Sequence, residues 1–399
     1  QIILFTTHLE RIKIKIMKDL TLVIPTYHRP NFLKRKLYHL FLQNCSSEII
    51  IVDSSKEMQL KRNNTIIREY KKKLKILYHK VSPKIHFAQK LYMGSKYSKT
   101  KYTVITFDDD YLNLIAVEKG MLFLKKNSDY TNASGYVLNH IKGKKIKPSR
   151  LPIMGKSDIF NDDDPLLRCE NFLNSKRKRN PLFNVWGTKL LQKMLEPVSK
   201  TKWKKYSEIL FDYVAVASGK AKFIEDIYEV RTVDHNKIEY RSHGLEGFRS
   251  LFENDLNDKM FFEVYNKMIL MAVEFICKQS NIDEIEASKK ITSLYFRLRS
   301  DKQIEGYVKE KNPRKIFFLE LMKKIKMFFL RIRYLRSFDN FKNLKIFLDV
   351  LRNYHYSEVG RILNTDPKFN FCYYSLKSGI SPYSKSYEHI NRSLEKFPN

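Results

Sequence analysis

TVITFDDDYL, residues Thr103 to Leu112, joins a β-prone run directly to three consecutive aspartates. Like charges repel one another and aspartate is a poor strand former, so Asp108, Asp109 and Asp110 need a reason to stand together. The apolar run predicts a buried strand that ends where the acids begin. In an extended segment, Asp108 and Asp110 would point to the same side.

The sequence before this stretch alternates between strand and helix patterns. Three short apolar runs predict buried strands at Leu20 to Tyr27, Glu48 to Ser55 and Leu74 to His79. The segments between the strands predict helices over residues 29–44, 61–75 and 84–98. This alternation is typical of a mostly parallel α/β sheet with helices on both faces.

Polar residues follow three of the predicted strands at the point where each strand ends. Pro25 and Thr26 end the first strand, Asp53 ends the second, and the aspartates follow the fourth. In a parallel α/β sheet, ligands collect at the carboxyl ends of the strands. We therefore expect these residues to meet at one edge of the sheet and to line the mouth of a ligand site.

The remainder of the chain predicts a second group of elements. These are a strand over residues 132–141, a long loop over 155–180, a strand turning into a helix at Gly187, and a helix ended by Gly219 with a strand to Arg231. From about residue 245, long amphipathic runs predict a mostly helical C-terminal domain. The expected organisation is an extension over residues 1–16, with Met17 as the expected start, an α/β domain over 17–244 and a helical domain over 245–399.

The 399-residue chain is strongly basic, with 75 Lys and Arg against 43 Asp and Glu and a formal net charge of +32. Such a charge predicts an anionic partner: a nucleic acid, an anionic membrane surface or a phosphorylated small molecule. An AT-rich coding sequence, which favours lysine codons, explains the excess equally well. No zinc-finger, OB or RRM signature is present, so we expect no nucleic-acid partner.

Cysteine usage and hydropathy bear on where the protein works. The 4 cysteines are far apart and form no CxxC pair, which disfavours zinc and disulfides and fits a reducing cytosol. No apolar run reaches the roughly 18 residues of a spanning helix, so a cytoplasmic protein is expected. The basic amphipathic stretch Arg314 to Arg336 predicts either a helix on the inner face of an anionic membrane or a core-packed helix.

The aspartate cluster also predicts a cation site. Mg²⁺ and Mn²⁺ prefer carboxylate oxygens and usually take one or two of them, with water and substrate phosphates completing the shell. One of Asp108 and Asp110 could hold such a metal while the other holds a nucleotide ribose; the alternative is a solvated turn. Arg231 and His235 could reach a diphosphate or complete the metal shell, or be ordinary surface residues.

Three motifs in order, LTLVIPTYHRPNFL, EIIIVDSS and YTVITFDDDYL, resemble the family 2 glycosyltransferases of the GT-A fold. The resemblance covers roughly Lys18 to His243 and is nearest to a divergent bacterial subgroup with an aspartate triplet. The chain departs from the family pattern at His28, where Asn is usual, and at the two serines that follow Asp53.

The resemblance implies a GT-A type, Rossmann-like fold and a metal-dependent transfer, by an inverting mechanism, from a nucleotide diphosphate sugar to a glycan or lipid-linked acceptor in surface polysaccharide synthesis. It implies Mg²⁺ or Mn²⁺ at Asp110, with Asp108 near the ribose and Asp53 at the uracil or its equivalent. Asp108 and, from its position after the last strand, His235 are the other candidate metal ligands. The other residues expected to bind the donor are Pro25, Thr26, Tyr27, Arg29, Asp109 and Arg231.

The family also uses an acid, often in a Glu-Asp pair, about eleven residues before a glycine that ends its helix. Glu208 lies eleven residues before Gly219, but Ser207 precedes it, so the pair is missing. The general base therefore stays open between Glu208 and Asp212, which share one helical face. The alternative for Glu208 is an exposed acid that pairs with Lys204 or Lys205.

Other classes of function and other residues are weighed against this interpretation. A sugar-phosphate nucleotidyltransferase would need a glycine-rich loop after the first strand, and IPTYHRPNF has no glycine. An inactive scaffold would not need to retain the acids. Lys90 is expected to be solvated, the acids Asp162 to Asp164 are expected in a solvated loop, and Trp186 suits a core position and an acceptor site equally well.

Overall fold

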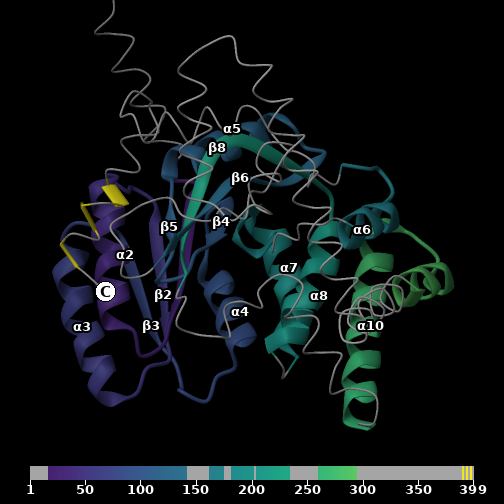
Figure 1. The fold of residues 1–399 in the computed structure, drawn as a ribbon, viewed down its shortest axis with the longest axis horizontal. Coiled ribbons are helices and arrows are strands. Elements are labelled where there is room, and N and C mark those ends of the chain that lie inside the picture. The colour runs from purple at the N-terminus through teal and green to yellow at the C-terminus, as the bar shows by residue number, and fades with distance from the viewer. Residues whose placement is uncertain are drawn as a thin grey trace, which may run out of the picture.

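The computed structural model describes residues 17–141, 161–174, 181–201, 204–233 and 259–293, together with 389–390, 392–393 and 396–397. Within these residues the chain forms an eight-stranded sheet in the order β3-β2-β1-β4-β7-β6-β8-β5. Figure 1 shows this sheet between two groups of helices. The strands are β1 (Leu20–Thr26), β2 (Glu48–Asp53), β3 (Ile76–Lys80), β4 (Tyr102–Ile105), β5 (Tyr111–Leu112), β6 (Tyr130–Ile141), β7 (Val185–Gly187) and β8 (Lys220–Val233).

The first half of the sheet is parallel. β1 pairs with β2 and β4, and β2 pairs with β3, all in parallel. Thr26 lies opposite Asp53 in the register of β1 and β2, so the carboxyl ends of the two strands meet, as predicted. The connecting helices are α2 (Pro30–Leu42), α3 (Glu57–Lys71) and α4 (Phe87–Tyr97).

The second half of the sheet changes direction. β7 pairs antiparallel with β4 and β6, β5 pairs antiparallel with β8, and β6 and β8 run parallel. The predicted α/β class is confirmed, and the parallel part of the sheet is β3-β2-β1-β4. The long strands β6 and β8 approach closely at Gly135, where a Cβ atom would lie 2.4 Å from the carbonyl oxygen of Asp226.

The helices of the second half are α5 (Leu114–Lys126), α6 (Pro165–Asn174), the short η2 (Pro181–Phe183), α7 (Thr188–Ser199), α8 (Lys204–Ala217) and α10 (Lys259–Ser280). The predicted strand-to-helix turn at Gly187 and the helix before Gly219 are both present. The predicted loop over residues 155–180 is wrong in its middle, because α6 begins at Pro165. Proline suits the first turn of a helix, and Asp164 Oδ1 accepts a hydrogen bond from the Leu166 amide.

Two hydrophobic cores cover the two faces of the sheet, as the strand period of two requires. In β1, Leu22 and Ile24 face the core that contains α2, α3 and α5, whereas Val23 faces the core that contains α4, α7 and α8. Each of these aliphatic side chains is fully buried, which contributes about 1.5–3 kcal/mol apiece. The sheet is therefore a rigid support for the polar residues at the carboxyl ends of its parallel strands.

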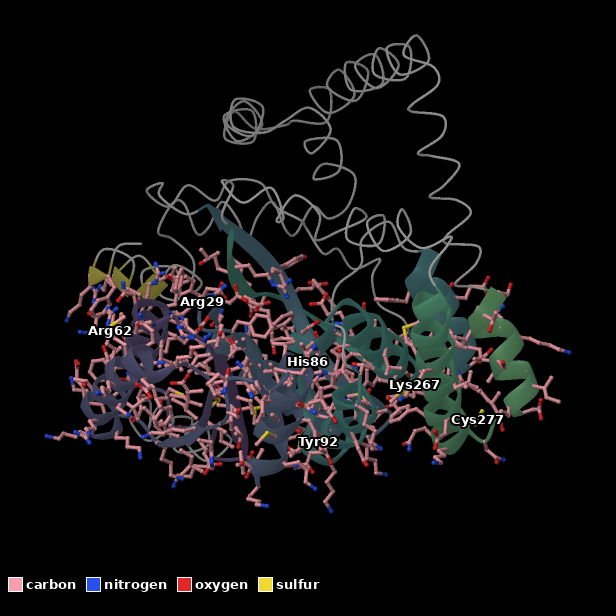
Figure 2. All side chains as sticks on the ribbon, turned by 90° about the horizontal axis from the view of Figure 1, so that it is seen from below. Arg29, Arg62, His86, Tyr92, Lys267 and Cys277 are labelled. Atoms are coloured by element: carbon pink, nitrogen blue, oxygen red, sulfur yellow. The ribbon has the colours of Figure 1, made fainter. Side chains whose placement is uncertain are left out.

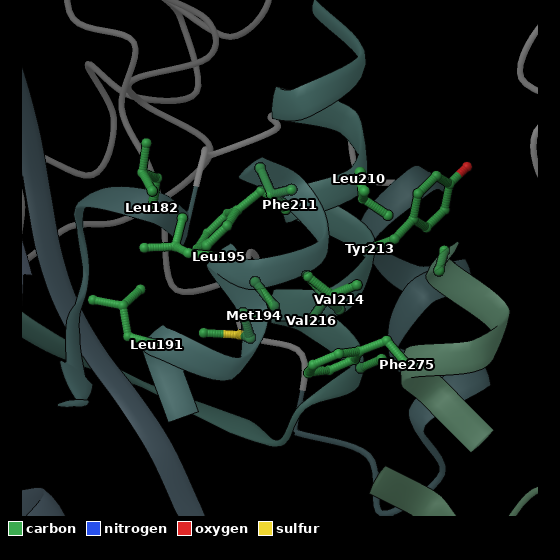
Figure 3. Packing of buried hydrophobic residues seen from close by; sticks show 14 of the residues in the cluster. Leu182, Leu191, Met194, Leu195, Leu210, Phe211, Tyr213, Val214, Val216 and Phe275 are labelled. Carbon is green, nitrogen blue, oxygen red and sulfur yellow. The ribbon is translucent and has the colours of Figure 1, made fainter. Parts of the chain in front are cut away.

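The second core, which contains α4, α7 and α8, continues into α10. Figure 3 shows Leu191 and Met194 of α7, Phe211 of α8 and Phe275 of α10 packed together. Trp186 of β7 is fully buried, and its Nε1 donates to the Pro181 carbonyl, so the core interpretation of this residue is confirmed.

No helix among the described residues combines the length and apolarity needed to cross a membrane. The expected extension over residues 1–16 and the basic stretch Arg314 to Arg336 lie outside the described residues.

Candidate active site

The three aspartates form a tight turn, here called the aspartate turn (Asp108–Asp110), between β4 and β5. The Asp110 amide donates to the Phe107 carbonyl at 3.3 Å, which closes the turn. The prediction of an extended segment with Asp108 and Asp110 on one side is therefore wrong. Asp108 contacts the end of β1, whereas Asp110 contacts the end of β8.

Asp108 is almost fully buried against the end of β1. Its Oδ2 accepts a hydrogen bond from Thr26 Oγ1 at 2.7 Å, and its Oδ1 lies 3.5 Å from Arg29 Nη1. The same Arg29 nitrogen lies 2.7 Å from Asp109 Oδ2. Burial, followed by the charge of Asp109, raises the pKa of Asp108 to about 7, despite the opposing effects of Arg29 and Thr26.

Asp110 is held from the side opposite Asp108, at the end of β8. Its Oδ1 accepts a hydrogen bond from the Thr232 amide at 3.3 Å, and Thr232 Oγ1 donates to the Asp109 carbonyl at 2.6 Å. Burial raises the pKa of Asp110 well above its ordinary value, and the charges of Asp109 and Glu229 raise it further. Burial is the largest cause of the raised pKa of both Asp108 and Asp110, so the ionised form of each carboxylate is disfavoured.

A buried ion pair on β8 forms the wall beside Asp110. Arg231 Nε donates to Glu229 Oε2 at 3.1 Å, and the guanidinium lies 4.3 Å from the ring centroid of Phe183. Burial alone would lower the pKa of Arg231, but Glu229 and Asp110 raise it overall. Glu229 Oε1 and Arg231 Nη2 are buried and have no hydrogen-bond partner in the described chain, which leaves an acceptor and a donor available beside the turn.

Glu229 was not predicted as a site residue, although the sequence holds a signal for it. Glu229 and Arg231 are two residues apart on a strand, so their side chains lie on the same face. Arg231 was predicted as a site residue, and the two-residue period of a strand indicates that Glu229 lies beside it on the same face.

Lys36 is a second site residue that the sequence did not indicate. It lies on α2, is fully buried, and its Nζ donates to Thr106 Oγ1 at 2.6 Å and to the Asp110 carbonyl at 2.7 Å. Burial lowers the pKa of Lys36 to about 8, against the opposing charges of Asp110 and Glu229. Helical periodicity assigns apolar residues to the core and treats a lysine as solvated, which is why this residue was missed.

Lys90 was expected to be solvated, and this expectation is wrong. Its side chain is buried beneath the ends of β1 and β2, where Nζ donates to the Thr26 carbonyl at 3.1 Å and to Ser54 Oγ at 2.7 Å. Burial lowers its pKa. The ammonium lies 5.6 Å from the ring centroid of Tyr27, which is 46% exposed at the rim of the mouth.

Asp53 ends β2 and is fully buried. Its Oδ1 accepts from the Ser55 amide at 2.8 Å, and its Oδ2 accepts from Asn63 Nδ2 at 2.8 Å and from Tyr78 Oη at 2.6 Å. The expectation that Asp53 meets the donor base stays a prediction. Any base would have to compete with three donors that are already in place.

The end of β1 explains the departure from the expected motif at His28. Pro25 is buried within β1, and the chain turns at His28 with φ of 58°. Asn, Asp and His enter this left-handed region more readily than other residues with a side chain, so His can replace Asn here. The His28 amide donates to Ser55 Oγ at 2.8 Å and so joins the ends of β1 and β2.

Glu208 and Asp212 both lie on α8 and are partly buried. α8 packs against η2, whose Phe183 ring contacts the Arg231 guanidinium and lies 4.8 Å from the ring of Phe107. A packed path thus joins α8 to the aspartate turn. That Glu208 faces the turn across the mouth stays a prediction.

In Figure 2, Arg29 lies on the side of the molecule toward which the long strands project, and Tyr92 of α4 lies on the opposite side. Among the described residues, no group of three or more His, Cys, Asp or Glu side chains is arranged to hold a metal ion, and His235 lies outside them. Because Asp108 and Asp110 turn to opposite strands, one of them could hold a hard cation, with substrate phosphates and water completing the shell.

No protein-family model and no curated protein matches the sequence. Among solved structures, S. aureus TarS 1-349 in complex with UDP-GlcNAc is 14% identical, with a TM-score of 0.44 over 90% of this chain and 92% of that chain. A longer S. aureus TarS structure gives a TM-score of 0.45 at 14% identity over 74% of this chain, which spans 46% of that protein. The mannosyltransferase PcManGT from Pyrobaculum calidifontis, in complex with GDP-Man and Mn²⁺, is 12% identical with a TM-score of 0.35 over 72% and 84% of the two chains. TM-scores below 0.5 at this identity do not establish a common family, so the function has to come from the site itself.

Proposed function

We propose that this protein is a metal-dependent, inverting glycosyltransferase. It would move a sugar from a nucleotide diphosphate sugar to a glycan or lipid-linked acceptor in surface polysaccharide synthesis. The observation that carries the proposal is the aspartate turn. Two carboxylates with raised pKa are buried at the carboxyl ends of parallel strands, between the cations Arg29 and Arg231.

The charge balance of the turn fits a bound divalent cation. The raised pKa of Asp108 and of Asp110 means that keeping both ionised at neutral pH is costly without additional positive charge. Asp110 would hold Mg²⁺ or Mn²⁺, and Asp108, which turns toward the end of β1, would lie near the ribose. When bound, the metal would supply positive charge to the leaving diphosphate.

The side chains of this chain would bind the rest of the donor. Arg231 has a buried Nη2 without a partner in the described chain, which suits a phosphate oxygen, and Arg29 bridges Asp108 and Asp109 on the other side. Tyr27 is exposed at the rim, where its ring could stack on the base. Thr26 and Lys90 hold the strand ends that carry these groups.

The transfer requires a base on the acceptor side. The acceptor hydroxyl oxygen would attack the anomeric carbon while the bond from that carbon to the diphosphate oxygen breaks. The hydroxyl proton would pass to a carboxylate on α8, either Glu208 or Asp212. General base assistance of this kind accelerates transfer by roughly 10²–10⁴-fold.

A donor screen tests the proposal. The full chain is incubated with UDP-, GDP-, ADP- and CMP-linked sugars, and release of the free nucleotide is measured with Mn²⁺, with Mg²⁺ and in excess EDTA. Release from at least one donor that depends on the metal is expected. Full activity in EDTA would exclude the metal role, and no turnover of any donor class, with a folded protein, would contradict the proposed reaction.

A cytoplasmic protein that docks on the inner face of a membrane would reach a lipid-linked acceptor. The basic stretch Arg314 to Arg336 motivates this part of the proposal, and it lies outside the described residues. Flotation with anionic vesicles, compared with neutral vesicles at low and high salt, tests it. Exposed charges are screened over about 10 Å at 0.1 M salt, so binding should weaken as salt rises.

A further inference from the structure

One face of α2 holds the segment that contains the aspartate turn. Lys36 Nζ donates to Thr106 Oγ1, at the start of this segment, and to the Asp110 carbonyl. One turn later, His39 Nε2 lies 3.1 Å from the Leu112 carbonyl. Two turns later, Gln43 Nε2 donates to the same carbonyl at 2.9 Å, and its Oε1 accepts from the Leu114 amide at 3.0 Å.

These three side chains form a polar clamp, defined here as Lys36, His39 and Gln43. Their spacing of three and four residues places them on one stripe of the helix, so the clamp follows directly from helical geometry. The clamp contacts the chain from Thr106 to Leu114, which begins just before the aspartate turn and ends at the start of α5. The same segment is also held by β1, through the Thr106 amide and Asp108, and by β8, through Asp110 and the pairing with β5.

Lys36 differs from the other two clamp residues because it carries the charge. Its ammonium is fully buried, and its neighbours in charge are Asp110, Glu229, Asp109 and Asp108. Its two hydrogen bonds reach either side of the turn, at Thr106 before it and at Asp110 within it. A long, buried side chain with two such anchors fixes the backbone of the turn rather than contacting a ligand in the mouth.

We propose that Lys36 is a positioning residue, which fixes the aspartate turn so that the carboxylates of Asp108 and Asp110 diverge toward β1 and β8. Loss of the ammonium would leave both anchor points without their donor and would free the turn to move. A displacement of about 1 Å in a catalytic group can lower a rate by roughly 10²-fold. The catalytic consequence rests on the proposed function, whereas the structural consequence does not.

The first measurement is hydrogen exchange, which needs no substrate. Lys36→Met keeps the length of the side chain and removes its donors. Amide exchange over residues 106–112 should become faster by roughly tenfold or more, while exchange over residues 49–53 of β2 stays unchanged. Lys34→Met is the matched control, because Lys34 lies on the same helix and its contacts are elsewhere: a 3.9 Å ion pair with Glu69 and the ring of Phe397, 5.1 Å away.

The second measurement separates positioning from binding. With the donor found in the screen, Lys36→Met should lower kcat by roughly 10²-fold and change the donor KM by less than about threefold, since the groups that bind the donor remain. Lys34→Met should keep the rate of the unmodified protein. A large rise in donor KM at unchanged kcat would overturn the positioning role.

A milder variant covers the case in which Lys36→Met fails to fold. Thr106→Val keeps the shape and the buried charge and removes one of the two anchors. It should raise exchange over residues 106–112 in the same direction by a smaller factor, about threefold. Unchanged exchange in a folded Lys36→Met, or in Thr106→Val if the first variant does not fold, would overturn the proposal. A protein that turns over no donor but shows the expected exchange would reject the proposed function and keep the role of Lys36.

Discussion

The chain contains two runs of three aspartates, Asp108–Asp110 and Asp162–Asp164, and their surroundings differ completely. Asp108 and Asp110 are buried, with raised pKa values. Asp163 is 95% exposed, and its ion pair with Lys220 lowers its pKa. Asp164 begins α6 by accepting the Leu166 amide.

The difference lies in what precedes each run. The first run follows a strand at the centre of the sheet, so the fold carries its charges to the mouth and buries them there. The second run precedes a helix, where carboxylates satisfy free amides and interact favourably with the helix dipole. The same three-residue sequence thus forms part of the candidate site at Asp108–Asp110 and precedes the N-terminus of α6 at Asp162–Asp164.

The largest expected effect tests this contrast directly. Asp110→Ala should lower donor turnover by roughly 10²–10³-fold, because it removes the acid assigned to the metal, whereas Asp163→Ala should leave the rate within about twofold. Circular dichroism should show both variants folded. Comparable losses in the two variants would mean that the two runs do not differ in function.

The next effect concerns the acid outside both runs. Glu208→Gln keeps the shape of the side chain and removes its basicity, so transfer should fall by roughly 10²-fold while donor binding barely changes. Asp212→Asn, one turn along α8, is the matched control and should matter less. The opposite ranking would assign the base to Asp212, and near-normal rates in both variants would leave the inverting mechanism without a base.

Asp53 provides a third kind of acid, one that is buried but fully hydrogen-bonded. Asp53→Asn replaces one acceptor by a donor that would face Ser55, Asn63 or Tyr78, so unfolding in urea should show a loss of about 1–3 kcal/mol. Tyr78→Phe, which removes only one donor, is the milder control. A variant as stable as the unmodified protein would show that these hydrogen bonds contribute little, and would favour a role for Asp53 at the donor base.

The smallest effect is a dependence of stability on pH. The pKa of Asp108 is about 7 in the folded protein, above its ordinary value of 3.8, so between these pH values the folded state binds more protons than the unfolded state. The contribution of Asp108 to the free energy of unfolding should therefore decrease as pH rises from about 4 to about 7. Urea unfolding of the unmodified protein and of Asp108→Asn across this range isolates that contribution. If the free energy of unfolding of the unmodified protein instead increases relative to that of Asp108→Asn as pH rises, the raised pKa of Asp108 is contradicted.

The sequence predicted the strands and their polar ends because both depend on local patterns. Apolar runs identify β1, β2 and β4, and the order of elements places Thr26, Asp53 and the aspartate turn at one edge. The roles of Lys36 and Lys90 could not be predicted from the sequence. They depend on which oxygen atoms of the sheet lie close to each helix in the folded protein. A buried lysine and a solvated lysine have the same sequence pattern until the partners are known.

The turn itself was misjudged for a related reason. The sequence pattern predicts an extended chain through Asp110, whereas β4 ends at Ile105, its last residue paired with β1, and the chain turns at Asp108. The spacing of Glu229 from Arg231 indicates a shared face of β8, but the position of that face beside the aspartate turn depends on the pairing of β8 with β5, which is far away in the sequence.

The position of β8 has a consequence for how the protein is made. The hydrogen bond from the Thr232 amide to Asp110 joins residues 122 positions apart. A nascent chain that has emerged only as far as β6 already contains β1 to β4 and the turn, but it has neither Glu229 nor Arg231. Contacts of such long range form late in folding, since the entropy of closing a long loop must be overcome first. The parallel half of the sheet can therefore be in place while the aspartate turn still lacks Glu229 and Arg231, so the proposed donor site is incomplete until β8 has been synthesised.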